Sequence, residues 1–591
     1  MTTTVESPLT PPISHDTAKG SKQQWAGLHG AASALAIIRT AKEKKAVLVV
    51  TPDTATANHL LEELHFFNEQ HNDQKSAVST LPILHFTDWE TLPYDIFSPH
   101  DDIVSTRLET LHTISHLQKG IVVVAMNTLM CRLPPLDYLQ KYSFIIKKND
   151  DFNIDNMRRQ LEASGYHCVD TVYSHGEFAV RGSLVDLFPM GSSLPYRIDL
   201  FDNEVDTLRT FDPETQRSIQ QVDNIYLLPA KEFPLDEDGI RTFRTQWHDR
   251  FTVDHRQCSI YQDISDAIAP AGIEYYLPLF FKECVSLFEY LPANTHIFSL
   301  TGIESAGEHY WREVHNRFES REGDLQRPIL SPTEIFLPVP DIFSRLKGFN
   351  QCVIQPSESD SAHIRFNSRA LPTLDVDAHS PQPYGQLSQF ITAFSGRILF
   401  CAESAGRREA LLSVLQPIGI KPVHVDNWHA FIDSDIALAI TESTIEQGFQ
   451  LSDPAIAVIT ETQLFGNQVK QRRRRKTSQD LSDQVIKNLT ELKIGAPVVH
   501  LDHGVGRYQG LETLVIGDGA EQETNEFLML EYANDAKLYV PVTHLHLISR
   551  YSGAAEGLAP LHKLGSDHWR KAKEKAVKEV RDVAAELLDI Y

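Results

Sequence analysis

A nucleotide-binding loop is the first chemistry that the residue spacing suggests. A P-loop follows the pattern G-x-x-x-x-G-K-[ST], in which the lysine neutralises the β- and γ-phosphates and the hydroxyl holds their Mg²⁺. Residues 27–34 have the length of this loop and precede an expected helix, but only Gly27 matches. Ala32 replaces the second glycine, Ser33 the lysine and Ala34 the hydroxyl. The segment is therefore a degenerate P-loop or a chance glycine–alanine turn, and we expect neither to hydrolyse a nucleotide.

Other catalytic patterns are missing from the sequence. It has no H-E-x-x-H, G-x-S-x-G or C-x-x-C motif, and no DExx segment follows an expected strand. Residues 236–238 (D-E-D) are expected in a solvated loop. The pairs His500/His503 and His544/His546 lack a cysteine or carboxylate set at metal spacing, so we expect structural or surface roles for them. The sequence thus predicts no catalytic residue, metal site or cofactor in this chain.

The best binding signal lies in residues 196–201, Y-R-I-D-L-F. In a strand, period two places Arg197, Asp199 and Phe201 on one face, where a phenylalanine is out of place in a folded monomer. Arg181 likewise alternates away from the apolar residues of its own strand. Arginine with an exposed aromatic is typical of a protein–protein hot spot. The alternative is that Phe201 is buried against another element and that the arginines form surface ion pairs.

The elements that must position these residues follow from the apolar pattern. Residues 25–142 alternate apolar strands, such as 46–50 and 121–125, with helical stretches such as 54–68. Strands that are apolar on both faces are typical of a parallel sheet covered by helices, which predicts an α/β domain. Residues 143–229 carry short strands broken by Gly and Pro, which predicts an α+β domain with a mainly antiparallel sheet.

Two further regions follow. Residues 230–369 show few clean periods, and we expect them to complete the first module. A second, small α/β domain is expected over 370–468, and only scaffolding follows from its residues. Its predicted elements are strands at 397–401, 422–425, 436–440 and 455–459 and a helix at 404–415.

The residue composition changes after residue 468. Residues 469–490 are expected to be a linker, because six of the seven residues 470–476 are basic and repel one another; contact with phosphate or a trafficking signal are the alternatives. Residues 491–555 carry short strands with turns at 503–506, 517–519 and 533–536, which predicts a small β-barrel of SH3 or Tudor size. Leu511 and Leu514 are expected in its core, with an exposed docking leucine as the alternative.

The last predicted element is a long helix over 566–591. It ends without a glycine, proline or capping residue, so we expect the chain to continue beyond residue 591; a helix that simply ends there is the alternative. Its apolar stripe steps by three and four through Val577, Val580, Ala584, Leu587 and Tyr591.

Composition limits the class of protein. The 591 residues predict roughly four compact units. The formal charge of −24 repels nucleic acid at long range. Six cysteines are scattered singly, which predicts reduced thiols in a cytoplasmic protein. Residues 1–24 have no signal-peptide pattern and are expected to be disordered, and no apolar run is long enough to span a membrane.

Four segments resemble known families. Residues 176–189 (GEFAVRGSLVDLFP) resemble the UvrB homology region of excision-repair proteins. Residues 499–508 (VHLDHGVGRY) and 532–541 (YANDAKLYVP) resemble the RNA-polymerase-interacting module shared with CarD proteins. With 580–589 (VRDVAAELLD), which resemble the helix leading into a motor, they make residues 25–591 similar to bacterial transcription-repair coupling factors.

This resemblance implies an adaptor that couples stalled RNA polymerase to nucleotide excision repair. The first three domains would form a UvrB-like module with a dead P-loop. Arg181, Arg197 and Phe201 would contact UvrA, and Leu514 and Arg507 would contact the β subunit of RNA polymerase. The family's ATP- and Mg²⁺-dependent DNA translocase would lie beyond residue 591, and contact with DNA would come through it.

Two other functions stay open at this point. A UvrB-type ATPase that handles damaged DNA would need a lysine where Ser33 stands. A CarD-type transcription regulator with unrelated N-terminal domains would bind polymerase and ignore UvrA. ATP turnover would favour the first, and a pull-down separates the second from the adaptor.

Overall fold

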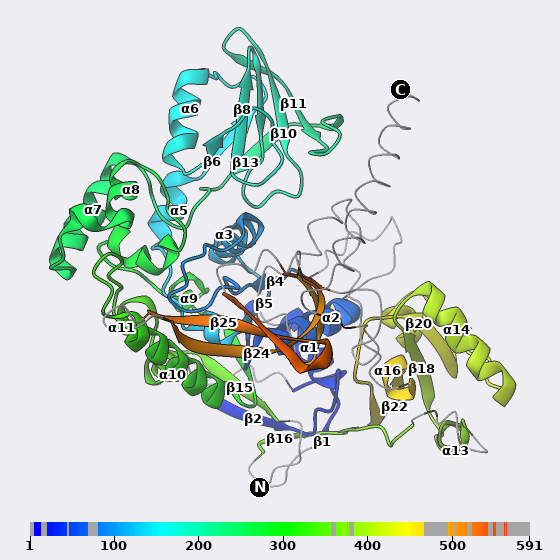
Figure 1. Ribbon diagram of the computed structural model, residues 1–591. Helices are drawn as coiled ribbons and strands as arrows, with labels where there is room; N and C mark the ends of the chain where they lie inside the picture. Colours follow the sequence, from blue (N-terminus) through cyan, green and yellow to red (C-terminus); the bar gives the residue numbers. More distant parts are fainter. Residues whose placement is uncertain are drawn as a thin grey trace. The chain divides into compact units, whose positions relative to one another are not determined.

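The computed structural model is shown in Figure 1. It describes residues 5–12, 20–43, 46–68, 81–355, 362–374, 376, 383–465, 494–500, 503–516, 523–541, 548–550, 561 and 563. The chain divides into two compact units, Met1–Asn467 and Gln468–Tyr591. The predicted helix over 566–591, the basic run 470–476 and the pair His544/His546 lie outside the described residues.

An eight-stranded sheet forms the body of the first unit, and all its pairs are parallel. Its strands, in spatial order, are β1 (Val5–Glu6), β16 (Ile364–Phe366), β2 (Lys22–Ala26), β15 (Asn350–Gln355), β14 (His296–Leu300), β3 (Ala46–Thr51), β5 (Gly120–Ala125) and β4 (Ile83–Phe86). Helices cover both faces, which explains why β3 and β5 are buried throughout. Leu48 and Val50 share a core with α3 (Asp101–Ser115), α10 (Ile303–Arg321) and α12 (Val339–Leu346). Val47 and Val49 share another with α1 (Ala32–Glu43) and α2 (Thr54–Asn68).

The predicted disorder of residues 1–24 is wrong at two places. Val5–Glu6 pair with β16, and Lys22–Gln24 pair with β15. Both strands begin with or contain polar residues such as Glu6 and Lys22–Gln24, and only partners more than 300 residues away hold them in the sheet. A pattern read along the chain cannot detect such a pairing.

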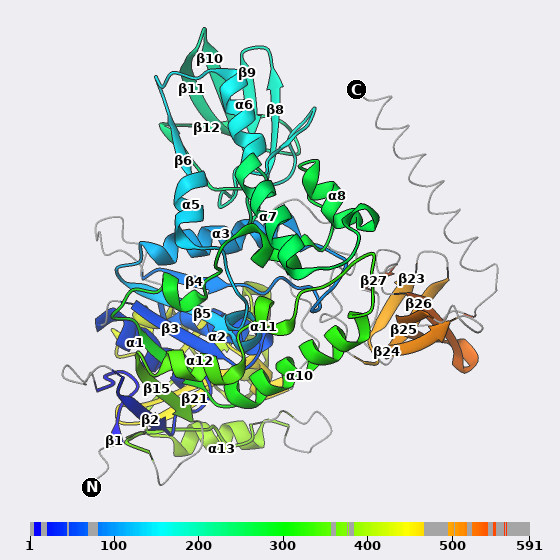
Figure 2. The same cartoon turned by 90° about the vertical axis from the view of Figure 1, so that its left-hand side faces the viewer.

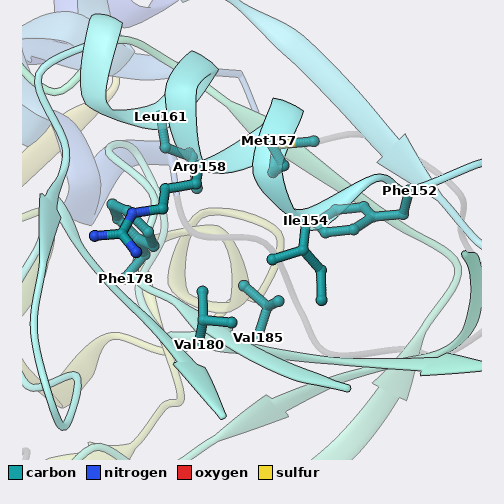
Figure 3. A pocket seen from close by; sticks show the side chains of 8 residues that line it. All are labelled: Phe152, Ile154, Met157, Arg158, Leu161, Phe178, Val180 and Val185. Atoms are coloured by element: carbon teal, nitrogen blue, oxygen red, sulfur yellow. The ribbon is translucent and has the colours of Figure 1, made fainter. Parts of the chain in front are cut away.

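A second, six-stranded sheet forms the predicted α+β domain. Its pairs are antiparallel except β7 with β8. The order is β12 (Ser218–Val222), β11 (Glu204–Phe211), β10 (Tyr196–Phe201), β9 (Leu184–Leu187), β8 (Glu177–Arg181) and β7 (His167–Cys168). Helix α6 (Ile154–Ala163) lies along one face of this sheet (Figure 2). The seam between helix and sheet is shown in Figure 3 and is lined by Phe152, Ile154, Met157, Arg158, Leu161, Phe178, Val180 and Val185.

Helix α3 ties this domain to the body. The domain leaves the body on β6 (Phe144–Lys147) and returns on β13 (Asn224–Leu227), which pair with each other. Polar contacts along α3 hold it in place, and the deepest is a fully buried ion pair. They are Arg107 with Glu232 (2.6 Å), Asp102 with His175 (2.8 Å), Asp101 with Lys231 (3.2 Å) and Ser105 with the amide of Gly191 (2.8 Å).

Residues 230–350 contribute helices and aromatic packing to the body. Asp236 accepts a hydrogen bond from Gly239 N (2.8 Å) and caps α7 (Glu237–Arg250). The prediction of a loop at residues 236–238 is therefore wrong, whereas their predicted solvation is confirmed for Glu237 and Asp238, which are exposed. Their acidic side chains suit the positive end of a helix, which sequence reasoning overlooked.

The predicted small α/β domain is present as a third sheet. Its order is β17 (Ser368–Arg369), β21 (Phe449–Ser452), β22 (Ala455–Thr460), β18 (Arg397–Ala402), β20 (Leu438–Glu442) and β19 (Val423–His424). Ser404 caps α14 (Ala405–Leu415), as the predicted helix over 404–415 requires. One face of the sheet packs on α1 and α2, where Trp428 meets Phe67 at 5.0 Å between ring centroids. Helices α1 and α2 therefore pack against two sheets.

The second unit contains a five-stranded antiparallel sheet. Its order is β26 (Ala536–Pro541), β25 (Glu523–Tyr532), β24 (Gly504–Ile516), β23 (Pro497–His500) and β27 (Ile548–Arg550). The turn predicted at 503–506 is shorter than expected, because β24 already begins at Gly504. Across the described ranges, no helix is both long and apolar enough to cross a bilayer.

Candidate functional site

The residues predicted to bind a partner lie on the face of the six-stranded sheet that α6 does not cover. Alternate residues of β8, β9 and β10 point toward α6 and are buried, as Val185 and Ile198 are. Their neighbours face outward, and Phe201 keeps 75% of its surface exposed. The predicted alternation of β10 is confirmed, and the alternative in which Phe201 is buried is wrong for the described structure.

The β-bulge between β10 and β11 lies on β11, so the alternation along β10 is intact. The register between β10 and β11 shifts after Asp199, which pairs with Thr207, to Leu200, which pairs with Val205. The extra residue, Asp206, therefore lies on β11. Because β10 itself runs without interruption, Phe201 stays on the same face as Asp199.

One buried carboxylate holds both predicted arginines. Asp186 is 0% exposed and accepts hydrogen bonds from Arg181 Nη2 (2.5 Å), Arg197 Nε (2.7 Å) and Arg197 Nη2 (2.9 Å). Arg197 also donates to the carbonyl of Gln216 (3.0 Å) and lies 4.7 Å above the ring of Phe211. The hydrogen bonds to Asp186 raise the pKa of the Arg197 guanidinium. The arginines are thus ion-paired, as the alternative supposed, but their shared carboxylate is buried.

The two arginines differ in exposure. The Arg181 side chain is 49% exposed and that of Arg197 only 16%. Arg197 is therefore held rigidly, and Arg181 has donors left for a partner. Sequence reasoning missed Asp186, although the signal was visible: a carboxylate in the apolar run 184–188, where aspartate is disfavoured in a strand.

The degenerate P-loop occupies the expected place between β2 and α1. Gly27 adopts a positive φ of 76°, and Ser33 Oγ donates to the carbonyl of Gly30 (3.2 Å). Ala32 and Ala34 are fully buried. No side chain of this loop offers a cation or a metal-binding hydroxyl where ATP and Mg²⁺ need them.

The small α/β domain closes the same loop. The amide of Ala31 donates to the carbonyl of Gln447 (3.0 Å). A Cβ on Gly30 would lie 2.5 Å from the carbonyl oxygen of Gly448. Carbonyl oxygens therefore lie against the start of α1, where a phosphate would need free N–H groups. These residues do not fit a nucleotide.

The candidate polymerase residues lie on β24 of the second unit. Arg507 is half-buried and pairs in register with Glu531. The backbone of Leu514 pairs with Asn525, and its side chain lies outside the described part. Leu511 is 38% exposed, so its predicted place in the core is wrong.

Metal ligation finds no support in the described ranges, where no group of three or more His, Cys, Asp or Glu could hold an ion. The rings of His500 and His503 lie 4.7 Å apart between centroids. All six cysteines are free thiols.

Comparison with known proteins finds matches for the domains that carry these surfaces. Family models match at residues 144–233 (UvrB interaction domain), 390–464 (MFD, D3 domain) and 492–552 (CarD-like/TRCF RID domain). The transcription-repair-coupling factor of Haemophilus influenzae is 45% identical over 95% of this chain and 48% of its own length. Those of Escherichia coli and Bacillus subtilis are 44% and 27% identical, each over 97% of this chain and 49% of their own length. The chain spans about half the length of the curated relatives it matches, and over nearly all of its own length it is similar to transcription-repair-coupling factors.

Proposed function

We propose that this chain is an adaptor in transcription-coupled nucleotide excision repair, working in the cytoplasm. One surface would bind UvrA and another the β subunit of RNA polymerase, so that repair proteins arrive where polymerase has stalled. The single observation that carries the UvrA side is the outward face with Arg181, Arg197 and Phe201, which lies in the matched UvrB interaction domain. Arginine and aromatic residues at an interface centre contribute about 2 kcal/mol or more each.

The polymerase side is supported by the match to the CarD-like/TRCF RID domain. We propose that the five-stranded sheet closes into a small barrel of SH3 or Tudor size and that Leu514 and Arg507 contact the polymerase. A strand face that carries a half-exposed leucine such as Leu511 suits docking better than a closed core.

We assign no ATP, Mg²⁺ or DNA contact to the described residues. The family's ATP-driven DNA translocation would belong to the part of the relatives' length that this chain does not span. The UvrB-type ATPase is disfavoured, because Ser33 stands in the lysine position and Gln447 blocks the start of α1.

The test measures each partner separately on the 591-residue chain. Arg197→Ala and Phe201→Ala should each weaken UvrA binding at least tenfold and leave polymerase binding unchanged. Leu514→Ala should do the reverse. Arg158→Ala is the matched control, because Arg158 is an exposed, ion-paired arginine of the same domain on α6. Wild-type affinity of both UvrA-side variants would remove the assignment.

A further inference from the structure

The outward face of the six-stranded sheet does not end at β10. Arg197 stands directly opposite Arg209 of β11 in the register. Like charges opposite each other destabilise a sheet, so each arginine needs its own compensation. Asp186 pairs with Arg197 (2.7 Å), and Asp199 pairs with Arg209 (2.8 Å). Two adjacent arginines are thus kept in place by two separate carboxylates.

The second pair is oriented as well as the first. The hydroxyl of Thr207 donates to Asp199 Oδ2 (2.9 Å) and accepts from Arg209 Nη2 (3.0 Å). The Arg209 side chain keeps 41% of its surface exposed, which is close to that of Arg181. Arg209 therefore offers a held guanidinium with donors free for a partner.

The other end of the face is negative. Phe201 pairs in register with Glu204, and both are exposed. In the described part of the chain, the Glu204 carboxylate has no ion-pair partner. Asp206, the extra residue of the bulge, is also exposed and adds to the negative charge. At about 3.3 Å per residue, the arginine pair and the Phe201 rung lie about 13 Å apart.

We propose that the docking face continues onto β11, where Arg209 and Glu204 give it opposite charges at its two ends. This inference rests on the proposed function and specifies what the partner must carry: carboxylates against the arginine end, a hollow for Phe201, and a cation against Glu204. Such a pattern matches in one orientation only, which fixes how the partner sits.

The opposite charges at the two ends of this face favour a protein as its binding partner. A nucleic acid carries one sign of charge along its length and would meet Glu204 and Asp206 with its phosphates. The sheet face also offers no continuous basic stripe, because Asp186 and Asp199 neutralise two of the arginines. A folded protein surface can present both signs with an apolar hollow between them.

The test uses charge reversal on both ends of the face, with a matched pair on the opposite side of the domain. Arg209→Glu and Glu204→Arg should each weaken UvrA binding by the 591-residue chain at least tenfold. Arg158→Glu and Glu162→Arg reverse an ion pair of similar exposure on α6 (3.0 Å) and should stay within twofold of wild type. Arg209→Gln, which cannot repel Asp199, should bind UvrA about threefold more weakly than wild type. This variant controls for misfolding of Arg209→Glu.

The outcomes separate the inference from the function beneath it. Wild-type binding by Arg209→Glu and Glu204→Arg, with Arg197→Ala defective, would overturn the inference and leave the function standing. Wild-type binding by all of these variants would overturn both. Equal losses in the α6 controls would also overturn the inference, because the effect would then follow net charge and not the face.

Discussion

Replacing Asp186 by asparagine tests whether the buried carboxylate organises the docking face. Asparagine keeps the size of the side chain and removes the charge. Asp186 Oδ2 accepts from both arginines, whereas Oδ1 accepts only from Arg197 Nε. With an amide oxygen at the Oδ2 position, the NH₂ group of asparagine would face the Nε–H donor of Arg197. The substitution therefore removes the anion of both ion pairs while leaving the sheet register alone.

The magnitude follows from the exposure of the three groups. Breaking a fully buried pair costs about 3–5 kcal/mol of stability. Asp186 is fully buried, but Arg181 is half-exposed and can regain water. We therefore expect a loss of about 2 kcal/mol in the unfolding free energy. UvrA affinity should fall by about 5- to 30-fold, which corresponds to about 1–2 kcal/mol.

The assay is calorimetric titration of UvrA with Asp186→Asn, together with thermal unfolding of the same sample. Glu162→Gln serves as the control, because Glu162 pairs with Arg158 at the surface and such pairs contribute less than about 1 kcal/mol. A merely structural Asp186 would lower the unfolding temperature without changing affinity below it. A variant that stays folded and binds UvrA within twofold of wild type would refute the reasoning.

Three further predictions concern the first unit. Restoring the P-loop residues by Ala32→Gly, Ser33→Lys and Ala34→Thr should give no ATP binding, because Gln447 still occupies the start of α1; a micromolar Kd by titration with a fluorescent ATP analogue would contradict this. Burial lowers the pKa of His85 to about 4, so the folded state resists the proton that the unfolded chain takes up near its ordinary value of 6.5. This contributes up to about 3 kcal/mol to the free energy of unfolding above about pH 6.5, and the contribution is lost as the pH falls to about 4. When the free energy of unfolding by urea is plotted against pH, the rise over this range should be flatter for His85→Gln than for wild type. An unchanged slope would count against this role of His85. Gly448→Ala should destabilise the first unit by more than about 2 kcal/mol, since its Cβ would lie 1.9 Å from the carbonyl of Val458. Gly406→Ala, with nothing within 4 Å of its Cβ, should melt like wild type, and equal melting of the two variants would exclude the clash.

Local pattern was enough where burial repeats along a single element. The helix over 54–68 is present with those bounds, and the strand over 46–50 extends by one residue. Phe201 could be placed on the outward face because one period of two residues governs the whole of β10. These predictions need no knowledge of what packs against the element.

Features set by distant partners could not be predicted in this way. β2 depends on β15, more than 300 residues later, and the amide of Ala31, just before α1, finds its partner in the small α/β domain. A binding role for Arg209 could be inferred only from the strand register, which places it opposite Arg197. Asp186 is an intermediate case, since a carboxylate in an apolar strand signals a buried charge without naming its two partners.

Simultaneous binding tests the adaptor most directly. The 591-residue chain is mixed with RNA polymerase and UvrA, and the masses of the complexes are measured in solution. The account predicts a complex containing all three, which loses only UvrA with Phe201→Ala and only polymerase with Leu514→Ala. Partners that exclude each other, or a single substitution that releases both, would contradict it.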